Sequence, residues 1–300
     1  MEKRYIIGID QSTQGTKALL FDGVGHLLRR TDLPHRQIVN EKGWVSHDLN
    51  EIYRNTVQTV KTLVAESGVA PETIAGIGIS NQRETTAIWD KATGEPLEEA
   101  IVWQCGRASG IAQEIAEQGH AEEIREATGL QLSAYFPAAK MAWLLRNGGE
   151  ERQKRAADGK LCLGTIDSWL VYKLTGDHAF KTDFSNASRT QLFNLKTLAW
   201  DEKICEIFGI PACALARVCD SDAVYGTTTM EGLFSEPVPI CGVLGDSHAA
   251  LFGQGCLKPG MIKATYGTGS SLMMNIGDKP IQSSHGVVTS LAWGRGGKED

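Results

Sequence analysis

The stretch Ile6-Ile7-Gly8-Ile9-Asp10-Gln11-Ser12-Thr13-Gln14-Gly15-Thr16 stands near the start of the chain, and the apolar run Ala18-Leu19-Leu20-Phe21 follows it. Two apolar runs on either side of a polar, glycine-bearing turn predict a β-hairpin over residues 5–22. The segment from Ile262 to Ser271 repeats this pattern of strand, Gly/Ser/Thr turn and strand. Because the repeat is so widely spaced, it predicts two related domains with a boundary between Gly253 and Gly260.

The chain between these hairpins alternates helical and strand patterns. An apolar face predicts a helix over residues 48–66, which Asp48 would cap and Gly68 would end. Strands are expected at residues 74–80, 161–163 and 237–243, and further helices at residues 112–128 and 138–147. Mixed strands and helices in this order predict an α/β fold.

Composition excludes several classes of protein. The 300 residues are 42% hydrophobic and 22% charged, which is typical of an ordered globular protein. A net charge of -6 argues against nucleic acid as a partner, because phosphate binding needs a basic surface. We find no signal peptide and no apolar run long enough for a membrane span, so we expect a cytoplasmic protein. The seven cysteines contain no Cys-x-x-Cys pair and are expected to be small buried residues.

The turn of the first hairpin has the groups that a phosphate site needs. Ser12, Thr13, Gly15 and Thr16 offer backbone N–H groups and hydroxyls in a tight turn. Asp10 would repel phosphate unless a cation stood between them, so we expect Mg²⁺ beside it. The second hairpin, at Gly267-Thr268-Gly269, would supply an opposing clamp. The alternative is a plain hairpin whose glycines and threonines merely turn the chain.

Polar side chains follow the strand expected at residues 74–80. Open α/β sheets place ligands at this end of their strands. Arg83 donates hydrogen bonds and Glu84 accepts them, which suits a polyol whose hydroxyls do both. Trp103 and Tyr135 would form an apolar wall against the C–H face of the polyol. The alternatives are a solvated ion pair on an exposed loop and two ordinary core aromatic residues.

Asp246 lies between the strand expected at residues 237–243 and a helix that starts near Ala249. A carboxylate in this position suits the removal of a proton from an attacking hydroxyl, while metal-bound ATP presents its γ-phosphate in line. The alternative for Asp246 is a helix N-cap without a catalytic role. His248, two residues on, is expected to be structural.

The sequence resembles the FGGY carbohydrate kinases, and among them the glycerol kinase branch. The segment Tyr135-Phe136-Pro137-Ala138-Ala139-Lys140-Met141-Ala142-Trp143-Leu144-Leu145-Arg146-Asn147 fits the first signature of the family at every constrained position. Similar blocks stand at residues 81–89, 100–105, 164–170, 182–190 and 245–254. The similarity therefore spans essentially the whole chain.

This resemblance implies an actin-like (ribonuclease H-like) ATPase fold with a mixed sheet flanked by helices. Residues 1–253 would form the N-terminal domain, which binds the sugar or polyol. Residues 254–300 would begin a similar C-terminal domain, which binds the nucleotide. Family members are longer than this chain, so we expect the 300 residues to be truncated, to bind nucleotide poorly and to catalyse little.

The resemblance also implies a function, an ATP-dependent kinase for a small polyol with glycerol as the first candidate. The polyol would be held by Arg83, Glu84, Trp103, Tyr135, Asp246 and Ser247, with Asp246 as the catalytic base. The nucleotide phosphates would contact Thr13, Gln14, Gly15, Lys17, Gly267 and Thr268. Mg²⁺ would be held by Asp10 and Asp246. Lys140 belongs to the signature and is expected to be structural.

Several positions depart from the usual family pattern. Ser247 stands where glycerol kinases usually have Gln, and Gly106 stands where they usually have Arg. In the first turn, Gln14, Gly15 and Lys17 replace Thr, Ser and Arg. Shorter side chains enlarge the pocket, so a larger polyol or ketose, such as erythritol, xylitol, ribulose or xylulose, stays an alternative substrate.

Two functions of other classes also stay open, an actin-like ATPase without a sugar substrate and a non-catalytic sugar sensor. Self-association into a homo-oligomer is expected only by analogy with the family.

Overall fold

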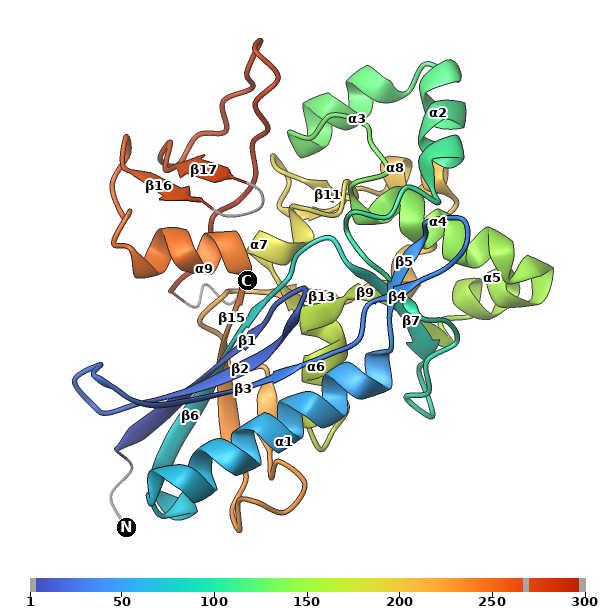
Figure 1. Ribbon diagram of the computed structural model, residues 1–300. Coiled ribbons are helices and arrows are strands. Elements are labelled where there is room, and N and C mark those ends of the chain that lie inside the picture. The colour runs from blue at the N-terminus through green and yellow to red at the C-terminus, as the bar shows by residue number, and fades with distance from the viewer. Residues whose placement is uncertain (1–3, 267–269, 297–300) are drawn as a thin grey trace.

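The computed structural model describes residues 4–266 and 270–296, and its largest element is a six-stranded mixed sheet (Figure 1). Its strands follow the order β14-β15-β6-β1-β2-β3. The first strand, β1 (Tyr5–Gln11), runs parallel to β6 (Ile74–Asn81), which in turn runs parallel to β15 (Val238–Gly245). The other three strands are antiparallel to their neighbours: β2 (Gly15–Phe21), β3 (Leu27–Pro34) and β14 (Gly226–Thr228).

Two helices pack on this sheet and bury the first hydrophobic core. Helix α1 (Leu49–Ser67) lies against β1, β2 and β3, and α6 (Ile166–Leu174) contacts β6 and β15. The N-terminus of α1 is capped as predicted, because the Asp48 side chain accepts hydrogen bonds from the backbone N–H groups of Asn50 and Glu51. Gly68 ends the helix in the left-handed conformation, with φ of 72°.

A second sheet and a group of helices form the other core. This five-stranded sheet has the order β4-β5-β8-β7-β9, with β4 (Ile38–Val39), β5 (Val45–His47), β8 (Ala100–Ile101), β7 (Thr86–Asp90) and β9 (Leu161–Thr165). The helices around it are α2 (Ser109–Glu117), α3 (Ala121–Thr128), α4 (Pro137–Asn147), α5 (Gly149–Ala157) and α8 (Glu202–Phe208). The single helix predicted over residues 112–128 is wrong, because Gly119 takes φ of 88° and separates α2 from α3.

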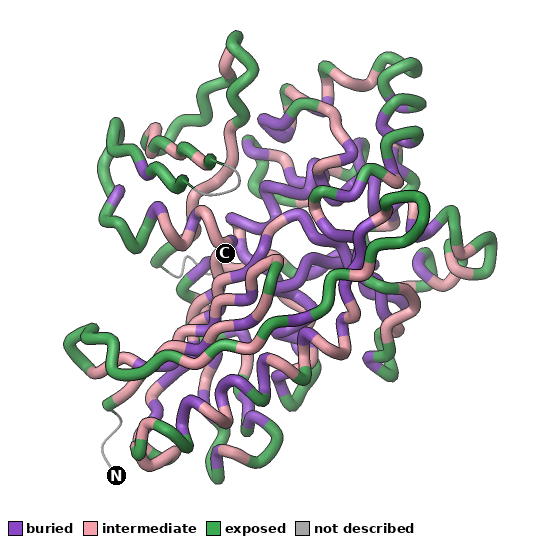
Figure 2. The backbone as a smooth tube through the Cα atoms, in the orientation of Figure 1, coloured by how far each residue is buried: buried purple, intermediate pink, exposed green. Residues whose placement is uncertain are grey.

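The remaining elements are short. They are η1 (Pro71–Thr73), β10 (Lys181–Asp183), α7 (Phe184–Ala187), β11 (Phe193–Asn194), β12 (Ala199–Trp200), η2 (Ala212–Ala214), β13 (Arg217–Cys219), α9 (Asp246–Gly253), β16 (Ile262–Thr265) and β17 (Ser271–Met274). Strands β16 and β17 pair antiparallel, which confirms the second predicted hairpin. Figure 2 shows that this hairpin is largely exposed, whereas the first hairpin lies within the buried sheet.

Two glycines have a packing reason that the sequence did not reveal. A Cβ atom on Gly15 would lie 2.6 Å from the carbonyl oxygen of Leu33 and 2.9 Å from the Cα of Pro34. A Cβ atom on Gly76 would lie 2.7 Å from the Sγ of Cys241. Close approach of the β3 backbone therefore requires glycine at position 15, whereas at Gly76 the space of a side chain is taken by the thiol of Cys241.

None of the described helices is long and apolar enough to cross a membrane. The seven cysteines are free thiols, and Cys213 and Cys241 are exposed. Cys219 is only half-buried, so the expectation that all of them are buried is wrong for these three.

Candidate active site

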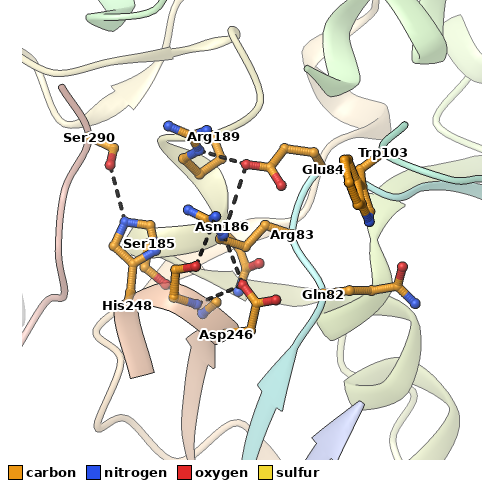
Figure 3. Close-up of polar contacts among 12 residues, drawn as sticks. Gln82, Arg83, Glu84, Trp103, Ser185, Asn186, Arg189, Asp246, His248 and Ser290 are labelled. Carbon is orange, nitrogen blue, oxygen red and sulfur yellow. Dashed lines mark hydrogen bonds and ion pairs between the residues drawn. The ribbon is translucent and has the colours of Figure 1, made fainter. Parts of the chain in front are cut away.

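The ends of two parallel strands bring the predicted charged residues together. Strand β6 leads into Arg83 and Glu84, and the neighbouring strand β15 leads into Asp246 at the start of α9. Nε of Arg83 donates to Oδ1 of Asp246 at 3.0 Å, and Nη2 of Arg83 donates to Oγ of Ser247 at 3.1 Å (Figure 3). Arg83 therefore links both residues that begin α9.

Glu84 is held by an arginine that the sequence interpretation did not identify. Nε of Arg189 donates to Oε1 of Glu84 at 2.7 Å, and Nε of Arg83 lies 3.9 Å from the same oxygen. The side chains of Arg83 and Glu84 are only 12% and 3% exposed. The alternative of a solvated ion pair on an exposed loop is therefore wrong. Glu84 also takes φ of 59°, a backbone conformation that non-glycine residues adopt uncommonly.

Asp246 is not the N-cap of α9. The cap position belongs to Gly245, and the Asp246 carboxylate instead accepts hydrogen bonds from Arg83 and from the backbone N–H of Ser247, the latter at 2.6 Å. Its side chain keeps 42% of its surface exposed. Surrounding protein atoms raise the pKa of Asp246 by desolvation, Glu84 and Asp10 raise it further, and the Arg83 guanidinium opposes this rise. Asp246 thus combines a raised basicity with access to solvent.

Trp103 and Tyr135 lie together, as the predicted wall requires. Their rings meet edge to face, with centroids 5.7 Å apart. Nε1 of Trp103 donates to Oγ1 of Thr13 at 2.9 Å, so this wall is bonded to the turn of the first hairpin. A cavity of about 360 Å³ adjoins both rings and Gly106, but the charged residues Arg83, Glu84 and Asp246 do not line it.

Lys140 supports the wall from inside the protein. Its side chain is fully buried, and its ammonium group donates to the backbone carbonyl of Tyr135. Burial lowers the pKa of Lys140 to about 7. This contact fixes the backbone of Tyr135, which agrees with the structural role expected for Lys140.

His248 is fully buried as well. Its Nε2 lies 3.1 Å from the Oγ of Ser290, and burial lowers the pKa of the imidazole well below its usual value.

Hydrogen bonds close the predicted phosphate turn, and its charged side chains are partly exposed to solvent. The backbone N–H and the hydroxyl of Ser12 both donate to the carbonyl of Gly15, at 2.9 and 3.0 Å. Nζ of Lys17 donates to Oδ2 of Asp10 at 2.8 Å, and their side chains are 34% and 31% exposed. Gln14 is exposed at the tip. The other two predicted phosphate contacts, Gly267 and Thr268, lie outside the described residues.

The donor set for a cation is small. Among residues 4–266 and 270–296, no three His, Cys, Asp or Glu side chains form a metal-binding group. Asp10 and Asp246 are close enough for the charge of one to raise the pKa of the other. Two carboxylates fit Mg²⁺, which keeps several waters and takes phosphate oxygens as further ligands.

The short helix α7 is a part of the site that the sequence interpretation missed. Asn186 exchanges two side-chain hydrogen bonds with Asn81, at 2.9 and 3.0 Å. Oγ of Ser185 accepts from the backbone N–H of Gly245 at 2.8 Å. Helix α7 thereby connects the ends of β6 and β15, and it places Arg189 one turn later. The block at residues 182–190 was the available signal, although no role followed from it.

Comparisons with known proteins agree with this geometry. The sequence profile described as "FGGY family of carbohydrate kinases, N-terminal domain" matches residues 5–253. Glycerol kinase 2 of Thermotoga maritima is 46% identical over 295 residues, and glycerol kinase of Symbiobacterium thermophilum is 47% identical over 296 residues. These matches cover 98% and 99% of this chain, but only 59% of each relative.

Solved structures give the same picture. The structure of Plasmodium falciparum glycerol kinase with ADP matches with a TM-score of 0.90 at 35% identity, over 97% of this chain and 58% of that one. Xylulose kinase from Lactobacillus acidophilus matches with a TM-score of 0.80 at 24% identity, over 89% of this chain and 53% of that one, and shares the fold. The predicted actin-like fold is thereby confirmed. The chain belongs to the FGGY family of carbohydrate kinases.

Proposed function

We propose that this chain supplies the polyol site and the first phosphate turn of an ATP-dependent kinase. The kinase transfers the γ-phosphoryl group of ATP to a hydroxyl of a small polyol, with glycerol as the first candidate and glycerol 3-phosphate as its product. The observation that carries the proposal is the contact of 3.0 Å between Arg83 and an accessible Asp246, directly beside the buried Glu84. The glycerol kinase relatives support the choice of substrate.

Each charged side chain has a distinct role in this proposal. Arg83 donates to one polyol hydroxyl, and the second carboxylate oxygen of Glu84 accepts from another. Asp246 accepts the proton of the attacking hydroxyl as that oxygen bonds to the γ-phosphorus and ADP leaves, and its raised pKa makes it a stronger base for this step. Ser247 offers its hydroxyl beside Arg83. Trp103 and Tyr135 exclude water from the reacting group.

The phosphate side of the proposal rests on the turn between β1 and β2. Thr13, Gln14, Gly15 and Lys17 would contact the nucleotide phosphates, with Gly267 and Thr268 opposite them. Asp10 and Asp246 would hold Mg²⁺, which neutralises charge on the transferring phosphoryl group when it is bound. Close packing against β3 already requires glycine at position 15, so the presence of this glycine is not in itself evidence for a contact with the nucleotide.

A larger polyol or ketose is the second candidate substrate. The observation that favours it is the cavity of about 360 Å³ next to Trp103 and Tyr135, which also borders Gly106. Erythritol, xylitol, ribulose and xylulose are the compounds to compare with glycerol.

We also propose that residues 1–253 form the polyol-binding domain and that residues 254–300 begin the nucleotide-binding domain. Both hydrophobic cores are built from residues before Gly245, which supports a boundary beyond that point.

Calorimetric titration of the 300-residue chain with glycerol and the four larger compounds tests the substrate. We expect saturable binding of glycerol, and binding of none of them would contradict the proposal. The reaction itself is tested in an extended chain, in which these residues are continued by the remaining part of the Thermotoga maritima relative. A coupled assay should detect ADP release that depends on the polyol.

Two outcomes of this assay would favour the other functions. ATP hydrolysis by the folded extended chain that no polyol changes would indicate an actin-like ATPase. Polyol binding without phosphorylation, in an extended chain shown to bind ATP, would indicate a sensor.

A further inference from the structure

Four charged side chains meet at the ends of β6 and β15, and we call Arg83, Glu84, Arg189 and Asp246 the charged cluster (Figure 3). Arg83 has two carboxylates within reach, because its Nε lies 3.0 Å from Oδ1 of Asp246 and 3.9 Å from Oε1 of Glu84. Arg189 occupies that same Glu84 oxygen at 2.7 Å. The two arginines are thus divided between the two carboxylates.

Arg189 is fixed in place from several sides. Its side chain is only 9% exposed, and its guanidinium lies over the ring of Phe136, 5.0 Å from the centroid. Its backbone N–H donates to the carbonyl of Asn186 at 3.1 Å, and Asn186 is bonded to Asn81 at the end of β6. The arginine and the Arg83-Glu84 segment are therefore held to the same strand end.

Removal of Arg189 would leave Glu84 as a buried carboxylate without its nearest cation. Burial of an unpaired charge is strongly unfavourable, so the remaining arginine in reach, Arg83, would move toward Glu84. That movement would lengthen the contact of Arg83 with Asp246 and with Ser247. The donor that faces the polyol would then point in another direction.

We propose that Arg189 is a positioning residue for the phosphoryl transfer, because it occupies Glu84 and so leaves Arg83 to Asp246 and the polyol. This inference rests on the proposed function for its effect on polyol binding. Its structural part, the choice of partner by Arg83, does not depend on any substrate. In this proposal Arg189 contacts Glu84 and does not contact the polyol.

The test compares Arg189→Gln and Arg189→Lys with a matched control, Arg152→Gln. Arg152 is also a largely buried arginine, 16% exposed, and it pairs with Glu98 at 3.0 Å in another part of the protein. The Nε–H signal of Arg83 in the ligand-free chain, assigned by its loss in Arg83→Lys, reports the partner of Arg83 by NMR. Calorimetric titration with glycerol then reports the polyol site.

We expect Arg189→Gln to shift the Arg83 signal and to weaken glycerol binding by about 10–100-fold, the size of loss that follows when the partner that orients a metal ligand is removed. Arg189→Lys should give a smaller change in both, because lysine keeps the charge but not the planar fork. Arg152→Gln should lower the thermal unfolding temperature while both readouts stay at the wild-type value.

A folded Arg189→Gln chain with the wild-type Arg83 signal would overturn the proposal, as would equal changes in Arg152→Gln. If Arg189→Gln does not fold, the Arg83 signal of Arg189→Lys tests the proposal in the same way. A wild-type chain that binds no polyol would contradict the proposed function, while the NMR comparison would still decide the role of Arg189.

Discussion

The charged cluster and the predicted phosphate turn are built in opposite ways. In the cluster, Glu84 and both arginines are nearly buried, and each charge has a partner from a distant part of the chain. In the turn, Asp10 and Lys17 pair with each other across one hairpin, and about a third of each side chain is exposed. In the proposed function, the residues for polyol recognition are thus largely organised before any ligand binds, whereas the residues proposed for the phosphates are open to solvent.

This contrast has an energetic meaning. A buried ion pair is costly to break from one side, because the charge that stays behind has lost its water. An exposed pair contributes little, because solvent screens both charges. Substitutions in the cluster should therefore have much larger effects than matched substitutions in the turn.

The largest effect is expected for Asp246→Asn. Loss of the proposed base should slow ADP release in the extended chain by about a thousandfold, within the range for general base catalysis. Asparagine still offers an oxygen to Arg83, so glycerol affinity measured by calorimetry should change much less than the rate. An unchanged rate would remove Asp246 from the mechanism, and Asp158→Asn, at an exposed carboxylate paired with Lys160, serves as the control.

The next effect is on stability, in Glu84→Gln. A neutral side chain would leave Arg189 buried without its carboxylate, so the free energy of unfolding should fall by about 3 kcal/mol. Urea unfolding followed by circular dichroism measures this value. Glu98→Gln, which removes the more exposed partner of Arg152, should cost clearly less, and equal losses would contradict the assignment of the buried pair.

Lys140 gives a pH dependence to the buried side. Its pKa is about 7 in the folded chain, against about 10.4 for an unfolded lysine. Between these values the unfolded chain binds more protons, so the free energy of unfolding should rise with pH by about 1 kcal/mol per unit from pH 7.5 to 9.5. The slope should disappear in Lys140→Met, and urea unfolding at three pH values in this window would show it. Identical slopes in both chains would mean that this lysine stays protonated.

Trp103→Phe tests the bond that joins the two sides. Phenylalanine keeps an aromatic wall but removes the N–H that donates to Thr13 at 2.9 Å. Because an indole N–H only donates, the Thr13 hydroxyl accepts from it and keeps its own proton, which is available for the proposed contact with a phosphate oxygen. We expect the KM for ATP of the extended chain to rise roughly fivefold, about 1 kcal/mol, while glycerol affinity is preserved. If glycerol affinity changed while the KM for ATP did not, Trp103 would serve only as part of the apolar wall.

The smallest effect should follow from Lys17→Gln. The ion pair with Asp10 is exposed enough that its loss should change the free energy of unfolding by no more than about 0.5 kcal/mol. Any effect of Lys17→Gln should appear in the KM for ATP instead. A stability loss as large as that of Glu84→Gln would remove the contrast between the two sides.

Local rules made much of the fold predictable. The first hairpin and α1 follow from short-range patterns, and the Asp48 cap and the Gly68 end lie where the sequence predicts them. Arg83 and Asp246 were expected at strand ends, and the parallel pairing of β6 with β15 brings those ends together. The break at Gly119 escaped prediction because the apolar positions continue across it.

Arg189 escaped prediction for a different reason. It follows a helix of four residues that has too few positions for a periodic pattern, and its partner Glu84 lies 105 residues earlier. No local property of the sequence marks such a pair. The need for glycine at position 15 could not be predicted either, because it arises from the packing of this residue against β3.

The reciprocal amide pair between Asn81 and Asn186 has a consequence for how the protein is made. It joins positions 105 residues apart, and the contact of Arg83 with Asp246 spans 163 residues. Contacts of such long range form only after large loops have closed, which slows folding. Most of this chain must therefore have emerged from the ribosome before the charged cluster can form. A nascent chain would therefore lack the proposed polyol site, and a bound polyol would stabilise only molecules that have finished folding.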